Sequence, residues 1–267
     1  MDRSLQQLTA LWRFRHFVLG EVAKEFRARF ARSRLGALWI ILHPLALVAV
    51  YALVLSAVLA AKLPGIDSPY AFAIYLTAGI FAWSLFADIL TRCTRLFVEQ
   101  GNVLKKVVFP RITLPIIVLG VALIDNLVLL LAILIIFGLL GHWPGGQILW
   151  LPLLLLLNMA LALGLGLILG TLNVFIRDVG QVVPIALQFG FWLTPIVYTP
   201  DILPAALAAL LAWSPLFPLV GAYQSVLVFN TAPEPAHLLA LATLVTGLLA
   251  LALILFRRAS AEMVDLL

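Results

Sequence analysis

Residues 148–176 read ILWLPLLLLLNMALALGLGLILGTLNVFI, a run without a charged side chain. A helix needs about 20 predominantly apolar residues to cross the roughly 30 Å hydrocarbon core of a membrane. The run satisfies this requirement, and its apolar residues are continuous rather than alternating, which predicts a helix and not a barrel strand. This stretch therefore indicates a membrane protein built from helices.

The rest of the chain has the same character. Of its 267 residues, 64% are hydrophobic and only 11% are charged, which excludes an ordinary soluble domain. Its apolar runs predict an all-α integral membrane protein, with one six-helix transmembrane domain at 35–267. The six predicted spans are residues 35–61, 70–91, 112–140, 148–176, 179–198 and 238–256.

The basic residues are distributed unequally between the two sides of these spans. Sixteen of the seventeen Lys and Arg residues fall in segments that six spans place on one side, and only Lys62 falls on the other. Because loops rich in Lys and Arg stay in the cytoplasm, we expect both termini to be cytoplasmic.

Residues 1–34 carry eight basic residues and lack the short apolar core of a signal peptide. Their spacing predicts an amphipathic helix lying in the cytoplasmic interface, with an apolar stripe opposite Arg13, Lys24 and Arg27. The alternative is a solvated basic leader that only orients the first span. The stripe consists of Leu8, Leu11, Trp12, Leu19, Val22, Phe26 and Phe30.

The predicted cytoplasmic loop at 92–111 is more apolar than a solvated loop needs to be. Gly101-Asn102 should break the helix that leaves the membrane, and Pro110 should end a short helix after it. Apolar residues beside Lys105 and Lys106 suggest a knob that docks into a groove on a soluble partner. A hairpin lying on the lipid headgroups is the alternative.

Residues 199–235 contain no Lys or Arg and are divided by prolines. The pieces Asp201–Trp213 and Phe217–Phe229 would each form a helix of roughly 20 Å, which is too short to cross. We therefore expect a periplasmic re-entrant helical hairpin before the last span. Eight spans would preserve the same orientation and remain an alternative.

Few residues point to chemistry within the chain itself. A single cysteine, Cys93, excludes an internal disulfide, and four scattered His residues predict no metal site. No lysine follows a glycine, so a Walker-type phosphate loop is missing, and there is no Asp-x-Asp motif for a membrane-embedded glycosyl- or phosphotransferase. We expect the chain not to be an enzyme by itself and to bind no cofactor.

Three ionisable residues lie within the spans, namely His43, Asp88 and Asp125. Asp88 and Arg92 are four residues apart, which predicts a local ion pair. Asp125 lies in mid-span and is either a structural hydrogen-bonding node or the carboxylate of a proton-coupled secondary transporter. His43-Pro44 should bend the first span.

Aromatic residues concentrate in the first, second and fifth spans. They either form belts at headgroup depth or line a path along which sugar rings stack. The set consists of Trp39, Tyr51, Tyr75, Phe81, Trp83, Phe86, Phe189, Phe191, Trp192 and Tyr198.

Three motifs, in this order, carry a resemblance to a known family. They are RSRLGALWIILHP at 32–44, NVLKKVVFPR at 102–111, and NVFIRDVG at 173–180 followed by TPIVY at 194–198. Together they resemble the membrane (permease) subunit of ABC-type polysaccharide exporters, in the branch that exports O-antigen and teichoic acid. The resemblance extends over nearly the whole chain.

This resemblance implies a homodimer in the bacterial inner membrane with two copies of a cytoplasmic ABC ATPase, which would bind ATP and Mg. The substrate would be an undecaprenyl-linked glycan such as O-antigen, and no nucleic acid would be involved. A permease for capsule, teichoic acid or lipid export is the alternative within the same class.

The resemblance also implies roles for individual residues. Contact with the ATPase would involve Phe26, Phe30, Gly101, Asn102, Val103, Leu104, Lys105, Lys106 and Phe109. The translocation path would include Trp39, His43, Tyr51, Phe189, Trp192 and Tyr198.

Arg32 and Arg34 are candidates for an entrance that attracts the pyrophosphate of the lipid carrier, because guanidinium groups bind phosphate well. If a folded protein lacking both arginines bound the pyrophosphate lipid normally, this role would be withdrawn.

Overall fold

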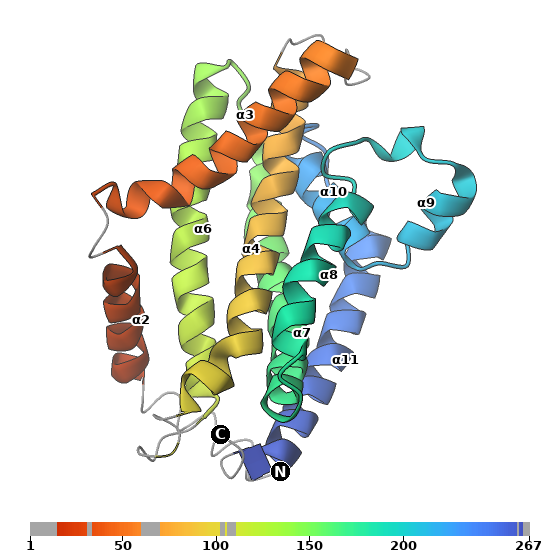
Figure 1. Ribbon diagram of the computed structural model, residues 1–267. Coiled ribbons are helices and arrows are strands. Elements are labelled where there is room, and N and C mark those ends of the chain that lie inside the picture. The colour runs from red at the N-terminus through yellow and green to blue at the C-terminus, as the bar shows by residue number, and fades with distance from the viewer. Residues whose placement is uncertain are drawn as a thin grey trace.

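The computed structural model describes residues 15–30, 34–59, 70–101, 105, 111–260, 262 and 263, and within these ranges the chain forms helices and no strand (Figure 1). Four helical segments in this part of the chain are long and apolar enough to cross a membrane. They are α4 (Ala71–Glu99), α6 (Thr113–Leu139), α7 (Leu151–Phe175) with the preceding 3-10 turn η2 (Gly146–Trp150), and α11 (Pro235–Ala259). The prediction of an all-helical membrane protein is confirmed, and the chain is a multi-pass membrane protein.

Helix α4 lies at the centre of the bundle and packs against α7 and α6. The two helices α4 and α7 lie close together at Gly166 and Gly170. A Cβ atom on Gly166 would lie 2.5 Å from Cβ of Cys93, and one on Gly170 would overlap the Cys93 carbonyl oxygen. Small residues allow membrane helices to pack backbone to backbone, so these two glycines determine how closely α4 and α7 approach.

The first part of the described chain comprises α2 (Arg15–Phe30), the 3-10 turn η1 (Gly36–Leu38) and α3 (Trp39–Leu59). Helix α3 crosses α6 and α4 obliquely, and α2 runs alongside α6 (Figure 1). The position of this helix in the cytoplasmic interface stays a prediction. Gly36 joins the two helices with a φ of +52°, a conformation that costs glycine little.

Helix α2 is held against α6 by a small apolar contact centred on Val22. Val22 is buried against Ile117 and Val121 of α6, and a Cβ atom on Gly120 would lie only 2.8 Å from Cγ2 of Val22. Val22 belongs to the predicted apolar stripe, whereas Leu19 of the same stripe is 65% exposed.

Gly120→Leu should release α2 from α6, because its side chain would occupy the space that Val22 fills. We expect faster hydrogen exchange in the backbone amides of α2, measured by mass spectrometry. Gly20→Leu is the matched control, since no atom lies within 4 Å of the added Cβ at Gly20. Equal exchange in α2 for both variants would contradict this packing.

Helix α4 continues past the predicted span end at Thr91 to Glu99, which agrees with the predicted break of this helix at Gly101-Asn102. One predicted span end needs correction. Helix α8 (Val179–Leu193) has 15 residues, about 22 Å, and ends before the predicted Tyr198. Thr194 leaves the helical conformation with a ψ of 139°, as expected of a residue that precedes proline. The count of six spans stays a prediction.

The predicted hairpin at 199–235 contains η3 (Pro200–Ile202), α9 (Ala205–Leu211) and α10 (Leu216–Leu227). The first helix of the predicted hairpin is shorter than predicted, because it begins only after Pro204, which interrupts the helical conformation. Helix α10 buries Tyr223 and Leu227 in the bundle, whereas α9 projects from it (Figure 1). The re-entrant position in the membrane stays a prediction.

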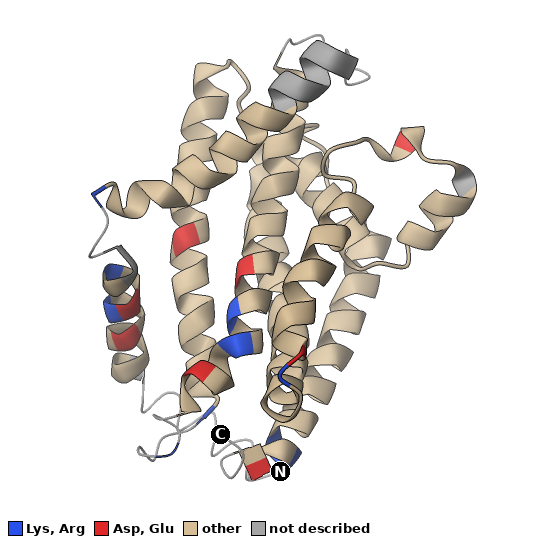
Figure 2. Cartoon of the chain, viewed as in Figure 1, with Lys and Arg blue, Asp and Glu red and all other residues tan. Residues whose placement is uncertain are grey.

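Basic residues of three segments lie towards one end of the bundle (Figure 2). They belong to the second half of α4, the turn between α7 and α8, and the last turn of α11. These segments lie at the same end of the bundle because the long helices alternate in direction. We refer to these three segments as the basic end. Its cytoplasmic location stays a prediction.

Candidate functional site

A cavity of about 710 Å³ opens between α3, α4, α6 and α8. Four of the six predicted path residues line it, namely Trp39, His43, Tyr51 and Trp192. Phe189 does not: its side chain is 67% exposed on another face of α8. Tyr198 lies in the turn after α8 and also does not line the cavity. The role of these residues in transport stays a prediction.

One wall of the cavity is a cluster of aromatic rings from three helices. Phe191 stacks on Tyr51 with ring centroids 5.9 Å apart and meets the edges of Trp83 and Trp192, each at 5.8 Å. Neither Phe191 nor Trp83 was among the predicted path residues. Helical spacing could have found Phe191, because Pro184, Gln188 and Phe191 recur at intervals of four and three residues and share one face of α8.

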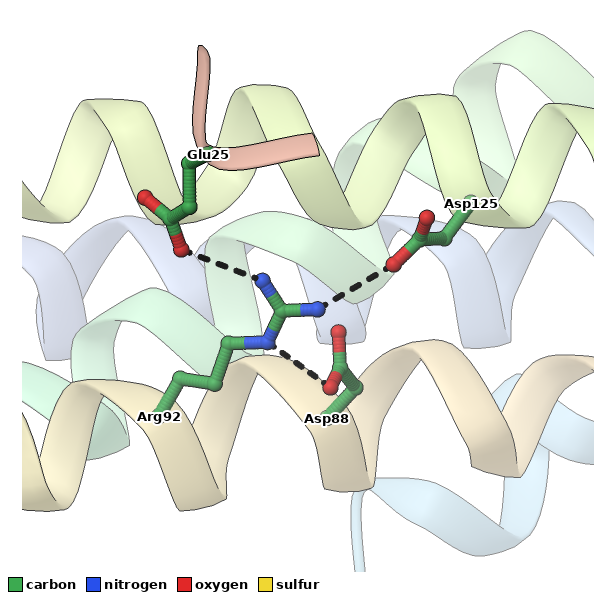
Figure 3. Close-up of polar contacts among 4 residues, drawn as sticks. All are labelled: Glu25, Asp88, Arg92 and Asp125. Carbon is green, nitrogen blue, oxygen red and sulfur yellow. Dashed lines mark hydrogen bonds and ion pairs between the residues drawn. The ribbon is translucent and has the colours of Figure 1, made fainter. Parts of the chain in front are cut away.

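The polar part of the cavity is organised by one guanidinium group (Figure 3). Arg92 of α4 donates from Nε to Oδ1 of Asp88 at 2.9 Å and from Nη2 to Oδ2 of Asp125 at 3.1 Å. Its Nη1 lies 3.6 Å from Oε1 of Glu25 on α2. The predicted pair of Asp88 and Arg92 is confirmed. Arg92 therefore joins α2, α4 and α6 through a single side chain.

The pairing of Asp125 with Arg92 was missed from the sequence, because the two residues are 33 positions apart on different helices. Asp125 is 13% exposed and Arg92 19% exposed at the side chain, so both are largely withdrawn from solvent. This arrangement favours the interpretation of Asp125 as a structural node. Asp88 and Asp125 also line the cavity, so their ion pairs with Arg92 lie beside the candidate translocation path.

The motif at 173–180 fixes the turn between α7 and α8 to α4. Asn173 donates from Nδ2 to the carbonyl oxygen of Thr94 at 3.0 Å and accepts at Oδ1 from the backbone N–H of Gly180 at 2.8 Å. Arg95 donates to the carbonyl oxygen of Gly180 at 3.4 Å. The start of α8, and with it one side of the cavity, is thereby held to the central helix at the basic end.

The motif at 194–198 is a non-helical turn that other helices hold in place. Tyr75 of α4 donates through Oη to the carbonyl oxygens of Pro195 and Tyr198, at 3.2 and 3.0 Å. Gln224 of α10 donates to the Pro195 carbonyl at 2.8 Å. Non-helical backbone is tolerated at membrane depth only where protein or water satisfies it, and here side chains supply these bonds.

The predicted contacts with the ATPase are mostly beyond what the structure describes. Phe26 is half-buried on α2, Gly101 is buried at the end of α4, and Lys105 is exposed. The side chain of Phe30 and residues Asn102, Val103, Leu104, Lys106 and Phe109 lie outside the described part. Of the predicted entrance pair, Arg34 is exposed and Arg32 lies outside the described residues.

Comparison with known proteins identifies the family. The family model described as "ABC-2 type transporter" matches residues 20–228, from α2 to the end of α10. This chain belongs to the ABC-2 type transporter family. The predicted resemblance to membrane subunits of ABC exporters is confirmed, and the family is one of transporter permeases rather than enzymes.

Curated relatives of this ABC-2 type transporter chain cover most of its length. The O-antigen export system permease protein RfbA of Myxococcus xanthus is 28% identical over 242 residues, which is 90% of either chain. A protein of the same name from Klebsiella pneumoniae is 25% identical over 212 residues, or 78% of either chain. The polysialic acid transport protein KpsM of Escherichia coli is 28% identical over 233 residues, or 86% of this chain and 89% of its own.

Proposed function

We propose that this chain is the transmembrane subunit of an ATP-driven exporter of a lipid-linked surface polysaccharide, such as O-antigen. Its relatives are named for the export of O-antigen and the transport of polysialic acid. The observation that carries the proposal within the structure is the cavity with an aromatic wall between α3, α4 and α8. Rings that stack weakly on sugars would let a polymer advance without being trapped at one position.

The proposed complex contains two copies of this chain and two copies of a cytoplasmic ABC ATPase, which supplies ATP and Mg. It lies in the bacterial inner membrane with both termini in the cytoplasm, as the distribution of Lys and Arg supports. The ATPase contacts the basic end, where the apolar segment at 101–109 follows α4 in the sequence. Motion of the ATPase would reach Arg92 and the cavity through α4, which carries Arg92.

The alternatives from other classes lose support. A proton-coupled secondary transporter would need Asp125 as its relay, but Arg92 holds this carboxylate and the family is that of ABC transporters. The transferase alternative has no support from the family either. An exporter of capsule, teichoic acid or lipid remains the alternative within the ABC class, and the identity of the transported glycan would distinguish it.

Affinity purification of the chain from native membranes tests the assembly. We expect an ATPase with a Walker motif to co-purify with the wild-type protein. We also expect Leu104→Glu to reduce its recovery by about tenfold or more, because a carboxylate buried in an apolar contact costs several kcal/mol.

The matched control for Leu104→Glu is Ile202→Glu, which places the same charge on an exposed apolar residue in η3. It should retain the ATPase. If no ATPase accompanied the wild-type protein, the proposed assembly would be wrong. Equal recovery with both variants would instead remove the role of the 101–109 segment.

A further inference from the structure

We infer that Asn126 of α6 binds the transported glycan inside the cavity, through a hydrogen bond between its side-chain amide and a sugar hydroxyl. The inference rests on the proposed function, because it assigns a binding residue to the same cavity. It adds a polar contact on α6 to the aromatic wall, and together the two surfaces define the ligand as a hydroxyl-bearing sugar ring.

The side chain of Asn126 carries a buried polar group that other residues do not satisfy. Asn126 is only 4% exposed, and within the described part of the chain its Oδ1 atom has no hydrogen-bond partner. A buried polar group without a hydrogen bond destabilises a fold, so its presence in a native protein needs an explanation. Asn126 lines the cavity, where a ligand can supply the missing bond.

Buried amides elsewhere in the described chain join one segment to another. Asn158 and Asn173 of α7 donate to carbonyl oxygens of α4, at 2.9 and 3.0 Å, and Gln224 of α10 donates to the Pro195 carbonyl at 2.8 Å. Among the described residues, no hydrogen bond of this kind involves Asn126. Bonding between helices therefore explains the other buried amides but does not explain this one.

The fold places this amide across the cavity from aromatic rings. Helices α6 and α8 pack on opposite sides of α4, and all three line the cavity (Figure 1). On α6, Ala122, Asn126 and Leu129 recur at intervals of four and three residues and so share the face that lines it. On α8, Phe191 and Trp192 present their rings to the same space. A sugar between these helices meets an amide on one side and aromatic rings on the other.

A sugar ring matches both surfaces. Its C–H face can stack on Phe191, while each of its hydroxyls can donate and accept a hydrogen bond. The amide of Asn126 can turn about its terminal torsion, which exchanges Oδ1 with Nδ2 at nearly the same shape, so it can offer either an acceptor or a donor. A single bond of this kind is weak enough for a polymer to leave it again, as transport requires.

The test compares Asn126→Leu with the wild type in the complete permease–ATPase complex in proteoliposomes. Export of a neutral hexose polymer on undecaprenyl pyrophosphate is measured at increasing mole fractions of this substrate in the membrane. We expect Asn126→Leu to raise the half-saturating mole fraction about fivefold, as the loss of one hydrogen bond predicts, with little change in the maximal rate. The purified variant should melt at the wild-type temperature or above, because leucine replaces an amide whose Oδ1 is unpaired within the described chain.

Asn126→Ala is a second variant, which cannot overpack the site and should show the same shift in saturation. Thr171→Val is the matched control, because the Thr171 hydroxyl is also buried and unpaired among the described residues but does not line the cavity. Its half-saturating mole fraction should equal that of the wild type.

Two results would overturn the assignment of Asn126 alone. One is saturation of both Asn126 variants at the wild-type mole fraction, or an equal shift with Thr171→Val. The other is loss of folding in both Asn126 variants, since the amide would then have a structural role. A wild-type complex that exported no glycan would instead overturn the proposed function itself.

Discussion

Gly170→Ala should lower the melting temperature of the purified protein by about 10 °C. The added methyl group would overlap the carbonyl oxygen of Cys93, which is backbone and cannot rotate away. Helices α4 and α7 would have to separate, and overpacking of this kind costs up to about 3 kcal/mol. The melting temperature in detergent, followed by size-exclusion chromatography after heating, measures this loss.

Gly247→Ala on α11 is the control for this substitution, because no atom lies within 4 Å of the Cβ it would add. Alanine is also the better helix former, so this variant should melt at the same temperature as the wild type or slightly above it. If the two variants melted together, the close approach of α4 and α7 at Gly170 would be contradicted.

Arg92→Met should destabilise the protein by about 3 kcal/mol, the lower end of the cost of removing one partner from a buried ion pair, because these side chains are only partly buried. Methionine retains much of the apolar stem but takes the guanidinium away from Asp88, Asp125 and Glu25. The bridge between α2, α4 and α6 would then be lost. We expect a fall in melting temperature of about 10 °C or more, whereas Arg258→Met, at an exposed position on α11, should change it little.

Adding Asp125→Asn to Arg92→Met should recover part of the lost stability, because it removes a carboxylate that the guanidinium no longer balances. Residues in one ion-pair network have interaction energies of about 0.5–3 kcal/mol in double-mutant cycles. If the stability changes caused by Arg92→Met and Asp125→Asn were simply additive, Arg92 and Asp125 would not form the ion pair at 3.1 Å.

Hydropathy along the chain was sufficient to place the longest helices. The predicted spans 112–140 and 148–176 correspond to α6 (Thr113–Leu139) and α7 (Leu151–Phe175), with ends within a few residues. The pair of Asp88 and Arg92 was also predictable, because it depends only on the spacing of one helical turn. The end of α8 was misplaced at Tyr198 because apolar composition continues through Thr194-Pro195, although the helix does not.

The sequence by itself thus determined that this is a helical membrane protein, which family its motifs resemble, and where Lys and Arg concentrate. Only the tertiary structure decided that Arg92 holds Asp125, that α2 packs along α6, and that Phe191 rather than Phe189 faces the cavity. Hydropathy and helical spacing are local properties, whereas these features depend on how helices are positioned against one another. In a membrane, where apolar surface alone does not select a partner, that positioning depends on close contacts such as Gly170 with Cys93 and Gly120 with Val22.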